Sequence, residues 1–260
     1  MTWIDTHCHI DSDKLSPNIQ DVLKSGLKAG ISGLVVPATS KNNFDRIIDV
    51  AHNYPQCFFA LGFHPLFIDD YEEGDMDVLT AYIKKHNPIA VGEIGIDLFT
   101  RKDNLIQQEN LFVKQIELAK SYDLPVIIHA RSAIDRVLKY LRTVKVSGGI
   151  IHAFNGSFQQ AEQLISLGFK LGFGGAMTYE RAIHIKKLAQ LLPIHSIVLE
   201  TDSPDMNPAW LEKGTPNEPK ELNKIARFLS ELRGIKLDKL AETIRVNSVT
   251  ALPKLAELYT

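Results

Sequence analysis

The sequence feature that most constrains the fold is an eightfold alternation of short apolar runs with longer amphipathic segments. The apolar runs are rich in Val, Ile, Leu and Phe and alternate little with polar residues, which is typical of strands covered on both faces. We therefore expect eight strands, at Trp3–Thr6, Gly33–Pro37, Cys57–Leu61, Ile89–Glu93, Val126–His129, Gly149–His152, Lys170–Phe173 and Ile197–Glu200.

The segments between these runs carry apolar residues at three- and four-residue spacing, which predicts amphipathic helices. Asn104 and Ser157 are placed to cap two of them, and Gly30 and Gly168 to end two others. The expected helices are Pro17–Ala29, Asn43–Asn53, Met76–Asn87, Leu105–Tyr122, Ala133–Thr143, Phe158–Leu167 and Tyr179–Leu191.

Eight strand–helix units in 260 residues average about 32 residues each, the size of a βαβ module. An open nucleotide-binding sheet normally has a glycine-rich turn after its first strand, whereas this chain has His7-Cys8-His9 there. We therefore predict the α/β class and a (β/α)8 TIM barrel that forms one domain over residues 1–260. Pro204–Glu218 is expected to be a long loop after the last strand, and Pro219–Leu258 to form C-terminal helices.

Composition narrows the classes of protein that the chain can belong to. A 45% hydrophobic fraction is enough to bury a large core, and a net charge of −2 excludes a histone-like grip on nucleic acid without excluding a local phosphate site. Two cysteines give no disulfide framework, and neither a signal peptide nor a membrane-spanning apolar run is recognisable. We expect a cytoplasmic protein with no membrane contact, as a monomer or weak oligomer.

Side chains that can bind metals recur at or just after the expected strand ends. His7 and His9 are two residues apart, so on an extended segment both imidazoles face the same way and reach one cation. Because the carboxyl ends of parallel barrel strands meet at one rim, groups from different strands converge there. Five strand ends contribute six such groups: His7, His9, Glu93, His129, His152 and Asp202.

Burying these six ionisable groups together without a cation would cost on the order of several kcal/mol. The imidazole and carboxylate set suits zinc, manganese, iron or cobalt, and magnesium is possible with fewer imidazoles. Glu93 could bridge two cations about 3.5–4 Å apart, and Asp202 is the best candidate to orient or deprotonate the attacking water. Histidines outside the strand ends, namely His52, His86, His184 and His195, are interpreted as solvated or core residues.

The motifs around these residues occur in a recognisable order along the chain. They are Ile4–His9, Leu61–Pro65, Val91–Asp97, Pro125–Arg131, His152–Gly156 and Glu200–Pro204, followed by Asn217–Pro219 and Asn247. As an ordered set, which runs from residue 4 to about residue 250, they resemble the signature of the TatD family of metal-dependent deoxyribonucleases.

This resemblance implies a TIM-barrel hydrolase of the amidohydrolase-like group that acts on ester bonds and binds two divalent cations, which would be zinc, manganese or magnesium. It places one cation on His7, His9, Glu93 and Asp202, and the other on Glu93, His129 and His152. It also implies DNA as the substrate, with 3′→5′ exonuclease activity on single strands. The chain departs from many relatives at Leu98-Phe99, where they have a Tyr pair, and in the loop after Pro204.

Two further residues are candidates for substrate binding. Arg131 lies two residues after His129 and could hold a phosphate oxygen, or equally form an ion pair with Asp135. His64 lies in a Gly-Phe-His-Pro turn and could contact the scissile phosphate, or equally orient a carboxylate that binds metal.

Other residues of these motifs have simpler interpretations. Asp97 is expected in a turn or as a group that orients a ligand, and Cys8 as a buried filler that points away from its two neighbouring histidines. Aromatic residues fall in the expected rim loops, where some are candidates to stack on bases and most are expected to pack: Phe63, Phe67, Phe99, Phe154 and Trp210.

The leading hypothesis is a metal-dependent phosphodiesterase acting on DNA. The alternative is a small-molecule hydrolase that cleaves an ester, an amide or a lactone on the same metal scaffold, since the metal set alone does not separate phosphorus from carbon chemistry. A third interpretation is a barrel that binds metal only for stability or as a scaffold for a partner. A closed apolar pocket at Pro204–Glu218 and Arg131 favours the small substrate, and an open cationic groove favours a strand of DNA.

Overall fold

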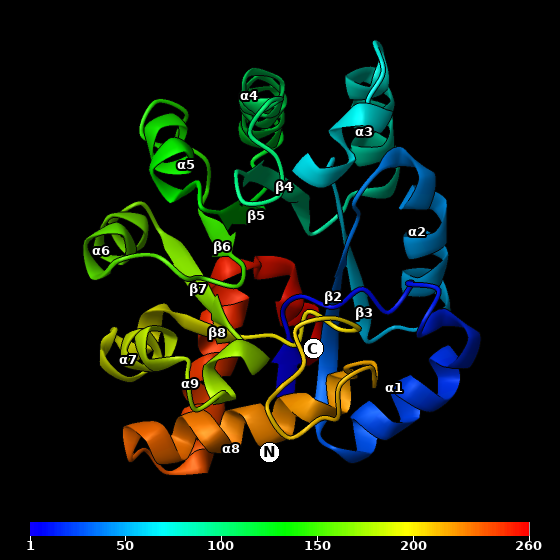
Figure 1. Cartoon of the computed structure of the whole chain (residues 1–260). Helices are drawn as coiled ribbons and strands as arrows, with labels where there is room; N and C mark the ends of the chain where they lie inside the picture. The colour runs from blue at the N-terminus through cyan, green and yellow to red at the C-terminus, as the bar shows by residue number, and fades with distance from the viewer. Residues whose placement is uncertain (260) are drawn as a thin grey trace.

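The computed structural model describes residues 1–259 and confirms the predicted eight-stranded parallel barrel (Figure 1). Each strand pairs with the next one along the chain, and the helices lie outside the ring of strands. The strands are β1 (Trp3–Asp5), β2 (Ile31–Pro37), β3 (Cys57–Leu61), β4 (Ala90–Asp97), β5 (Val126–Arg131), β6 (Gly149–Ile151), β7 (Phe169–Phe173) and β8 (Ile197–Leu199).

The helices agree with the periodicity of the sequence to within a few residues at most ends. They are α1 (Ile19–Lys28), α2 (Phe44–Asn53), α3 (Asp75–His86), α4 (Leu105–Ser121), α5 (Ile134–Leu141), α6 (Phe158–Ser166), α7 (Ile183–Leu191), α8 (Leu222–Arg233) and α9 (Leu237–Ala251). No helix among residues 1–259 is both long enough and apolar enough to cross a bilayer.

The helix ends follow the predicted signals in three of four cases. Ser157 caps α6 in a reciprocal pair with Gln160, and Gly30 and Gly168 take the left-handed conformation after α1 and α6. Asn104 was predicted to cap α4 with its side chain, and this prediction is wrong. Its Oδ1 instead accepts a hydrogen bond from Gln108 Nε2, at 2.6 Å.

The predicted end of the fourth strand is also wrong, because Glu93 lies inside β4 and the strand continues to Asp97. Gly95 makes this continuation possible, since a Cβ there would lie 1.9 Å from the carbonyl oxygen of His129 on β5. The pairing of β4 with β5 shifts register between Val91 and Ile94. Glu93 therefore sits at a β-bulge, an irregularity that re-aims a side chain.

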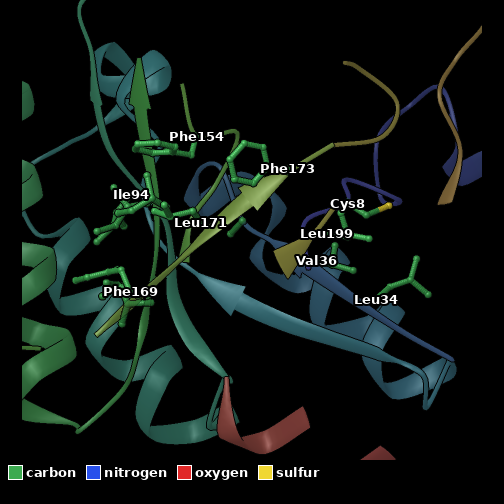
Figure 2. Close-up of a cluster of buried hydrophobic side chains, with 14 of the residues drawn as sticks. Cys8, Leu34, Val36, Ile94, Phe154, Phe169, Leu171, Phe173 and Leu199 are labelled. Carbon is green, nitrogen blue, oxygen red and sulfur yellow. The ribbon is translucent and has the colours of Figure 1, made fainter. Parts of the chain in front are cut away.

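Two apolar cores hold the barrel together. The larger core lies between strands and helices, and Figure 2 shows Phe169, Leu171 and Phe173 from β7 within it. The smaller core fills the barrel with one residue or two from most strands and is contacted by Leu252 and Leu255, from the segment after α9. Apolar packing thus occupies the barrel interior below the rim where the strands end.

Among residues 1–259, β8 and β1 form no ladder of backbone hydrogen bonds. The segments that follow these two strands close the barrel instead. The Thr6 amide donates to the Leu199 carbonyl at 3.1 Å, the Asp202 amide to the His7 carbonyl at 2.9 Å, and the His9 amide to the Ser203 carbonyl at 2.7 Å. The loop that carries two histidines is therefore held directly against the loop that carries Asp202.

Candidate metal centre

The Glu93 carboxylate lies at the centre of the histidines that the sequence singled out. Its Oε2 is 3.1 Å from His7 Nε2 and 3.6 Å from His9 Nε2. Its Oε1 is 3.1 Å from both His129 Nδ1 and His152 Nε2. One carboxylate oxygen thus faces each of two pairs of imidazoles, and these four imidazoles come from the ends of three strands, β1, β5 and β6.

Asp202 joins the pair on the Oε2 side, which we call the first group. Its Oδ1 lies 3.6 Å from His7 Nε2 and 3.7 Å from His9 Nε2. One ligand atom from each of His7, His9 and Asp202 lies within 4.8 Å of the others, a spacing that one metal ion can span. The second group consists of Glu93 Oε1, His129 and His152. The structure therefore brings together all six residues predicted from the strand ends.

Asp97 orients His129 from the side opposite Glu93. Its Oδ2 is 3.1 Å from His129 Nε2, and its Oδ1 accepts the amides of Phe99 and Thr100 at 2.9 and 2.8 Å. Asp97 therefore combines the two roles foreseen for it, in a turn and beside a ligand. A proton held on Nε2 by this carboxylate leaves the Nδ1 lone pair of His129 free to bind a cation.

Glu200 lies behind His152 as Asp97 lies behind His129, but at a longer distance, and the sequence reasoning missed it. Its buried Oε1 accepts the Ala153 amide at 2.6 Å and lies 3.5 Å from His152 Nδ1. Gly172 leaves room for this carboxylate, since a Cβ there would lie 2.2 Å from Glu200 Oε2. The available signal was an acid directly after the apolar run Ile197–Leu199, at the same rim as the histidines.

Asp5 is a second buried acid that the sequence reasoning did not single out. It accepts hydrogen bonds from the Thr201 amide and hydroxyl at 2.9 and 2.6 Å, and so ties β1 to the loop after β8. Burial raises the pKa of Asp5 to about 7, although its bonds with Thr201 act in the opposite direction. An acid inside the first apolar run was the sequence signal for this contact.

His64 lies on the same side of Glu93 as the second group, with Nε2 3.3 Å from Glu93 Oε1. Its Nδ1 accepts the Leu66 amide at 3.1 Å, so in this arrangement the ring proton is on Nε2. That proton points at Glu93 Oε1. Of the two roles considered for His64, this geometry favours orienting the Glu93 carboxylate over contacting a phosphate.

Arg131 projects from the end of β5 and is exposed. Its guanidinium carbon lies 3.9 Å from the centre of the Phe99 ring, in a cation–π contact. The considered ion pair with Asp135 does not form in residues 1–259; Asp135 Oδ1 accepts from Gln160 Nε2 at 2.7 Å instead. Arg131 thus stays available to an anion at the rim.

The electrostatics of the centre keep Glu93 ionised. Burial would raise its pKa, but the surrounding imidazoles hold it well below the usual range. Burial lowers the pKa of His7 to about 3, so His7 is neutral at pH 7. Burial also disfavours the charged form of His9, but Glu93 and Asp202 raise its pKa to about 9. For Asp202, burial raises the pKa to about 6.

These donors fit divalent cations. The nitrogens and carboxylate oxygens are of the borderline-to-hard type that zinc, manganese or cobalt prefer, and ligand atoms of His7, His9 and Asp202 lie within 4.8 Å of one another. Cys8 is not part of this set. Its thiol is buried in the larger core among residues such as Leu34, and burial raises its pKa well above the usual range, which agrees with the predicted filler role.

Residues 4–253, which include all of these site residues, match a known family model described as TatD related DNase. The chain belongs to the TatD family. It is 38% identical over 251 residues to the uncharacterised metal-dependent hydrolase YjjV of Escherichia coli K12, covering 95% of this chain and 96% of that protein. It is therefore a metal-dependent hydrolase, as the sequence predicted.

Other members of the TatD family agree with this placement. The mouse protein named putative deoxyribonuclease TATDN3 is 30% identical over 268 residues, covering 98% of this chain and 90% of that protein. The crystal structure of Escherichia coli YjjV superposes with a TM-score of 0.92 at 37% identity, covering 96% of this chain and 98% of that one. A TatD family hydrolase from Entamoeba histolytica shares the fold with a TM-score of 0.86 at 20% identity, covering 97% of this chain and 98% of that one.

Proposed function

We propose that this TatD family hydrolase is a deoxyribonuclease that binds two divalent cations and cleaves phosphodiester bonds in DNA, with 3′→5′ exonuclease action on single strands. The observation that carries the proposal is the position of the Glu93 carboxylate, because each of its two oxygens faces a separate pair of imidazoles. A pair of cations sharing one carboxylate suits in-line displacement at phosphorus. The family name and the name of the mouse relative support DNA as the substrate.

In this proposal His7, His9, Asp202 and Glu93 hold one cation, and His129, His152 and Glu93 hold the other. Zinc, manganese and magnesium are the candidate metals. Two such cations would polarise the phosphoryl oxygens and lower the pKa of the attacking water. Asp97 and Glu200 keep the imidazoles of the second group in the orientation needed for binding, and His64 does the same for the Glu93 carboxylate.

Asp202 is the proposed general base. Its Oδ1 faces the first group, and the second oxygen of the same carboxylate remains to accept a proton from water. A pKa raised to about 6 by burial leaves Asp202 ionised at pH 7 yet basic enough to take that proton. Arg131 would hold a phosphate oxygen at the rim, because its guanidinium has no carboxylate partner in the described part of the chain.

The test of this function is cleavage measured on a panel of single-stranded DNA, duplex DNA, RNA and activated carboxyl esters. Chelator treatment should abolish release of nucleotides, and added manganese, magnesium or zinc should restore it. Asp202→Asn should lower kcat by roughly 100- to 10,000-fold. Asp205→Asn is the matched control, since Asp205 lies in the same loop but is exposed and paired with Lys14.

Three results would reject the proposal. Undiminished cleavage by chelated protein would exclude a metal-dependent mechanism, and an unimpaired Asp202→Asn variant would remove the general base. Turnover of esters without turnover of DNA would instead establish the small-molecule hydrolase. A Glu93→Gln variant that stays folded but loses turnover would argue against a purely structural metal site.

A further inference from the structure

Two exposed aromatic side chains lie beside the second group. Phe67 is 44% exposed, and its ring centre lies 6.0 Å from that of His64. Phe99 is 66% exposed and follows Asp97, the partner of His129, by two residues. Two other aromatic residues of the rim loops, Phe63 and Phe154, are buried. The aromatic residues of the rim loops are therefore of two kinds: Phe63 and Phe154 pack in the core, and Phe67 and Phe99 face solvent.

The backbone that carries these two rings is held firmly. The Phe99 amide donates to Asp97 Oδ1 at 2.9 Å, and the Phe67 amide donates to the His64 carbonyl at 3.0 Å. Arg101 bonds to Asp69, next to the Phe67 turn, and to Asp103 in the Phe99 loop, so it ties the two loops together. The Phe99 and Phe67 amides are thus held by Asp97 and His64, two residues that contact the metal centre, so the main chain places both rings beside it.

The two arginines at this edge of the rim differ in their partners. Arg101 is neutralised by two carboxylates, whereas Arg131 lies against Phe99 with no carboxylate partner among residues 1–259. A guanidinium that covers an aromatic ring offers a flat cationic surface, which suits both a base and its phosphate. A hollow of about 360 Å³ is lined by Leu98 and Ser132, the sequence neighbours of Phe99 and Arg131, and by residues that include Asn155 and Asp135.

We propose that Phe99 together with Arg131, and Phe67 beside His64, form a stacking surface for unpaired bases next to the scissile phosphate. The proposal rests on the proposed nuclease function and names the residues that would bind the unpaired bases of its single-stranded substrate. In a duplex, neighbouring bases already occupy the two faces of each base, so they have none to offer a protein ring. Stacking on protein aromatics tolerates any sequence, because every base has a flat face.

The experiment combines changes in the enzyme with changes in the substrate. We would measure kcat/KM on a single-stranded oligonucleotide and on the same strand with abasic residues at the positions to be cleaved. Phe99→Ala should lower kcat/KM on the normal strand by roughly 5- to 150-fold. The same variant should lose little on the abasic strand, and Phe99→Trp should retain activity on both. Phe67→Ala should follow the pattern of Phe99→Ala.

The matched control is Tyr259→Ala. Tyr259 is 42% exposed and has the Arg245 guanidinium 4.9 Å from its ring centre, but it lies in the segment after α9, whose Leu252 and Leu255 contact the smaller core. It is expected to change neither substrate's kcat/KM. Equal losses by Phe99→Ala on normal and abasic strands, or no loss on the normal strand, would overturn the stacking proposal.

A binding measurement separates this proposal from the nuclease proposal. Fluorescence anisotropy of a labelled single strand, recorded in chelator so that nothing is cleaved, should show weaker binding by Phe99→Ala than by the parent. Weaker binding without any cleavage by the parent would reject the nuclease and keep the stacking surface. If the aromatic variants cleave and bind the strand as well as the parent does, the nuclease proposal stands and the stacking proposal is rejected.

Discussion

Replacing Asp97 by Asn should weaken cation binding by the second group, because it should move the ring proton of His129 from Nε2 to Nδ1. The Asp97 Oδ1 accepts two backbone amides, from Phe99 and Thr100. In Asn the carbonyl oxygen has to keep that place, because the NH2 group cannot accept those bonds. The NH2 group then faces His129 Nε2, where Asp97 Oδ2 stood 3.1 Å away.

An NH2 donor at this position requires a lone pair on His129 Nε2, so the ring proton moves to Nδ1. Nδ1 is the atom that lies 3.1 Å from Glu93 Oε1, and once protonated it cannot bind a cation. Removing a carboxylate that orients a metal ligand typically lowers metal affinity by roughly 10- to 100-fold, or about 1.4–2.7 kcal/mol. The effect of Asp97→Asn should reach at least this range for one of the two cations.

The assay is calorimetric titration of chelator-stripped protein with Mn²⁺ or Zn²⁺, which resolves the two cations by stoichiometry and affinity. Asp97→Asn should weaken one binding step and leave the step assigned to His7, His9 and Asp202 unchanged. Asp103→Asn is the control, because Asp103 belongs to the same loop but is exposed and paired with Arg101. Unchanged affinity at both steps in Asp97→Asn would refute the tautomer argument, and so would equal weakening by Asp103→Asn.

Three further predictions concern packing and protons. Gly172→Ala places a Cβ against the Glu200 carboxylate and should cost about 1–3 kcal/mol of stability in urea unfolding; an unchanged midpoint would show that Glu200 can move freely. His9 (pKa about 9) and His152 (pKa raised well above its usual range, because Glu93 and Glu200 outweigh burial) carry protons at pH 7 in the metal-free protein. Cations displace these protons, so affinity should rise with pH, and calorimetry in buffers of different ionisation enthalpy should record proton release; no release would contradict the shifts. Phe112→Ala removes a fully buried ring from α4 and should cost about 3–5 kcal/mol in the same unfolding assay, whereas a loss below about 1 kcal/mol would mean that the core collapses around the gap.

The architecture was predictable from the sequence because each apolar run is long enough to be a buried strand and each intervening segment has helical periodicity. The site was predictable for the same reason: once the strands are parallel, a residue at a strand end has a known place at the rim. His7, His9 and Asp202 are brought together on this basis, although the two histidines follow the first strand of the chain and Asp202 follows the last.

The remainder depended on contacts that no local pattern records. The continuation of β4 past Glu93 depends on the close fit of Gly95 against β5, and the register shift between Val91 and Ile94 is visible only in the paired strands. The role of Glu200 depends on space left by Gly172 on the neighbouring strand. The side chain of Asn104 bonds to Gln108 because the Gln108 amide also bridges the backbone of Asp97, a contact that outweighs the local capping preference.

The seam between β1 and β8 has a consequence for biosynthesis. A ribosome releases His7 and His9 early, but Asp202 emerges only after nearly four-fifths of the chain has been made, and the bonds that join the two loops need both ends. A nascent or truncated polypeptide that stops before residue 202 would thus present an incomplete cage to an ion. The complete set of cation ligands would therefore form only after the final strand has been translated.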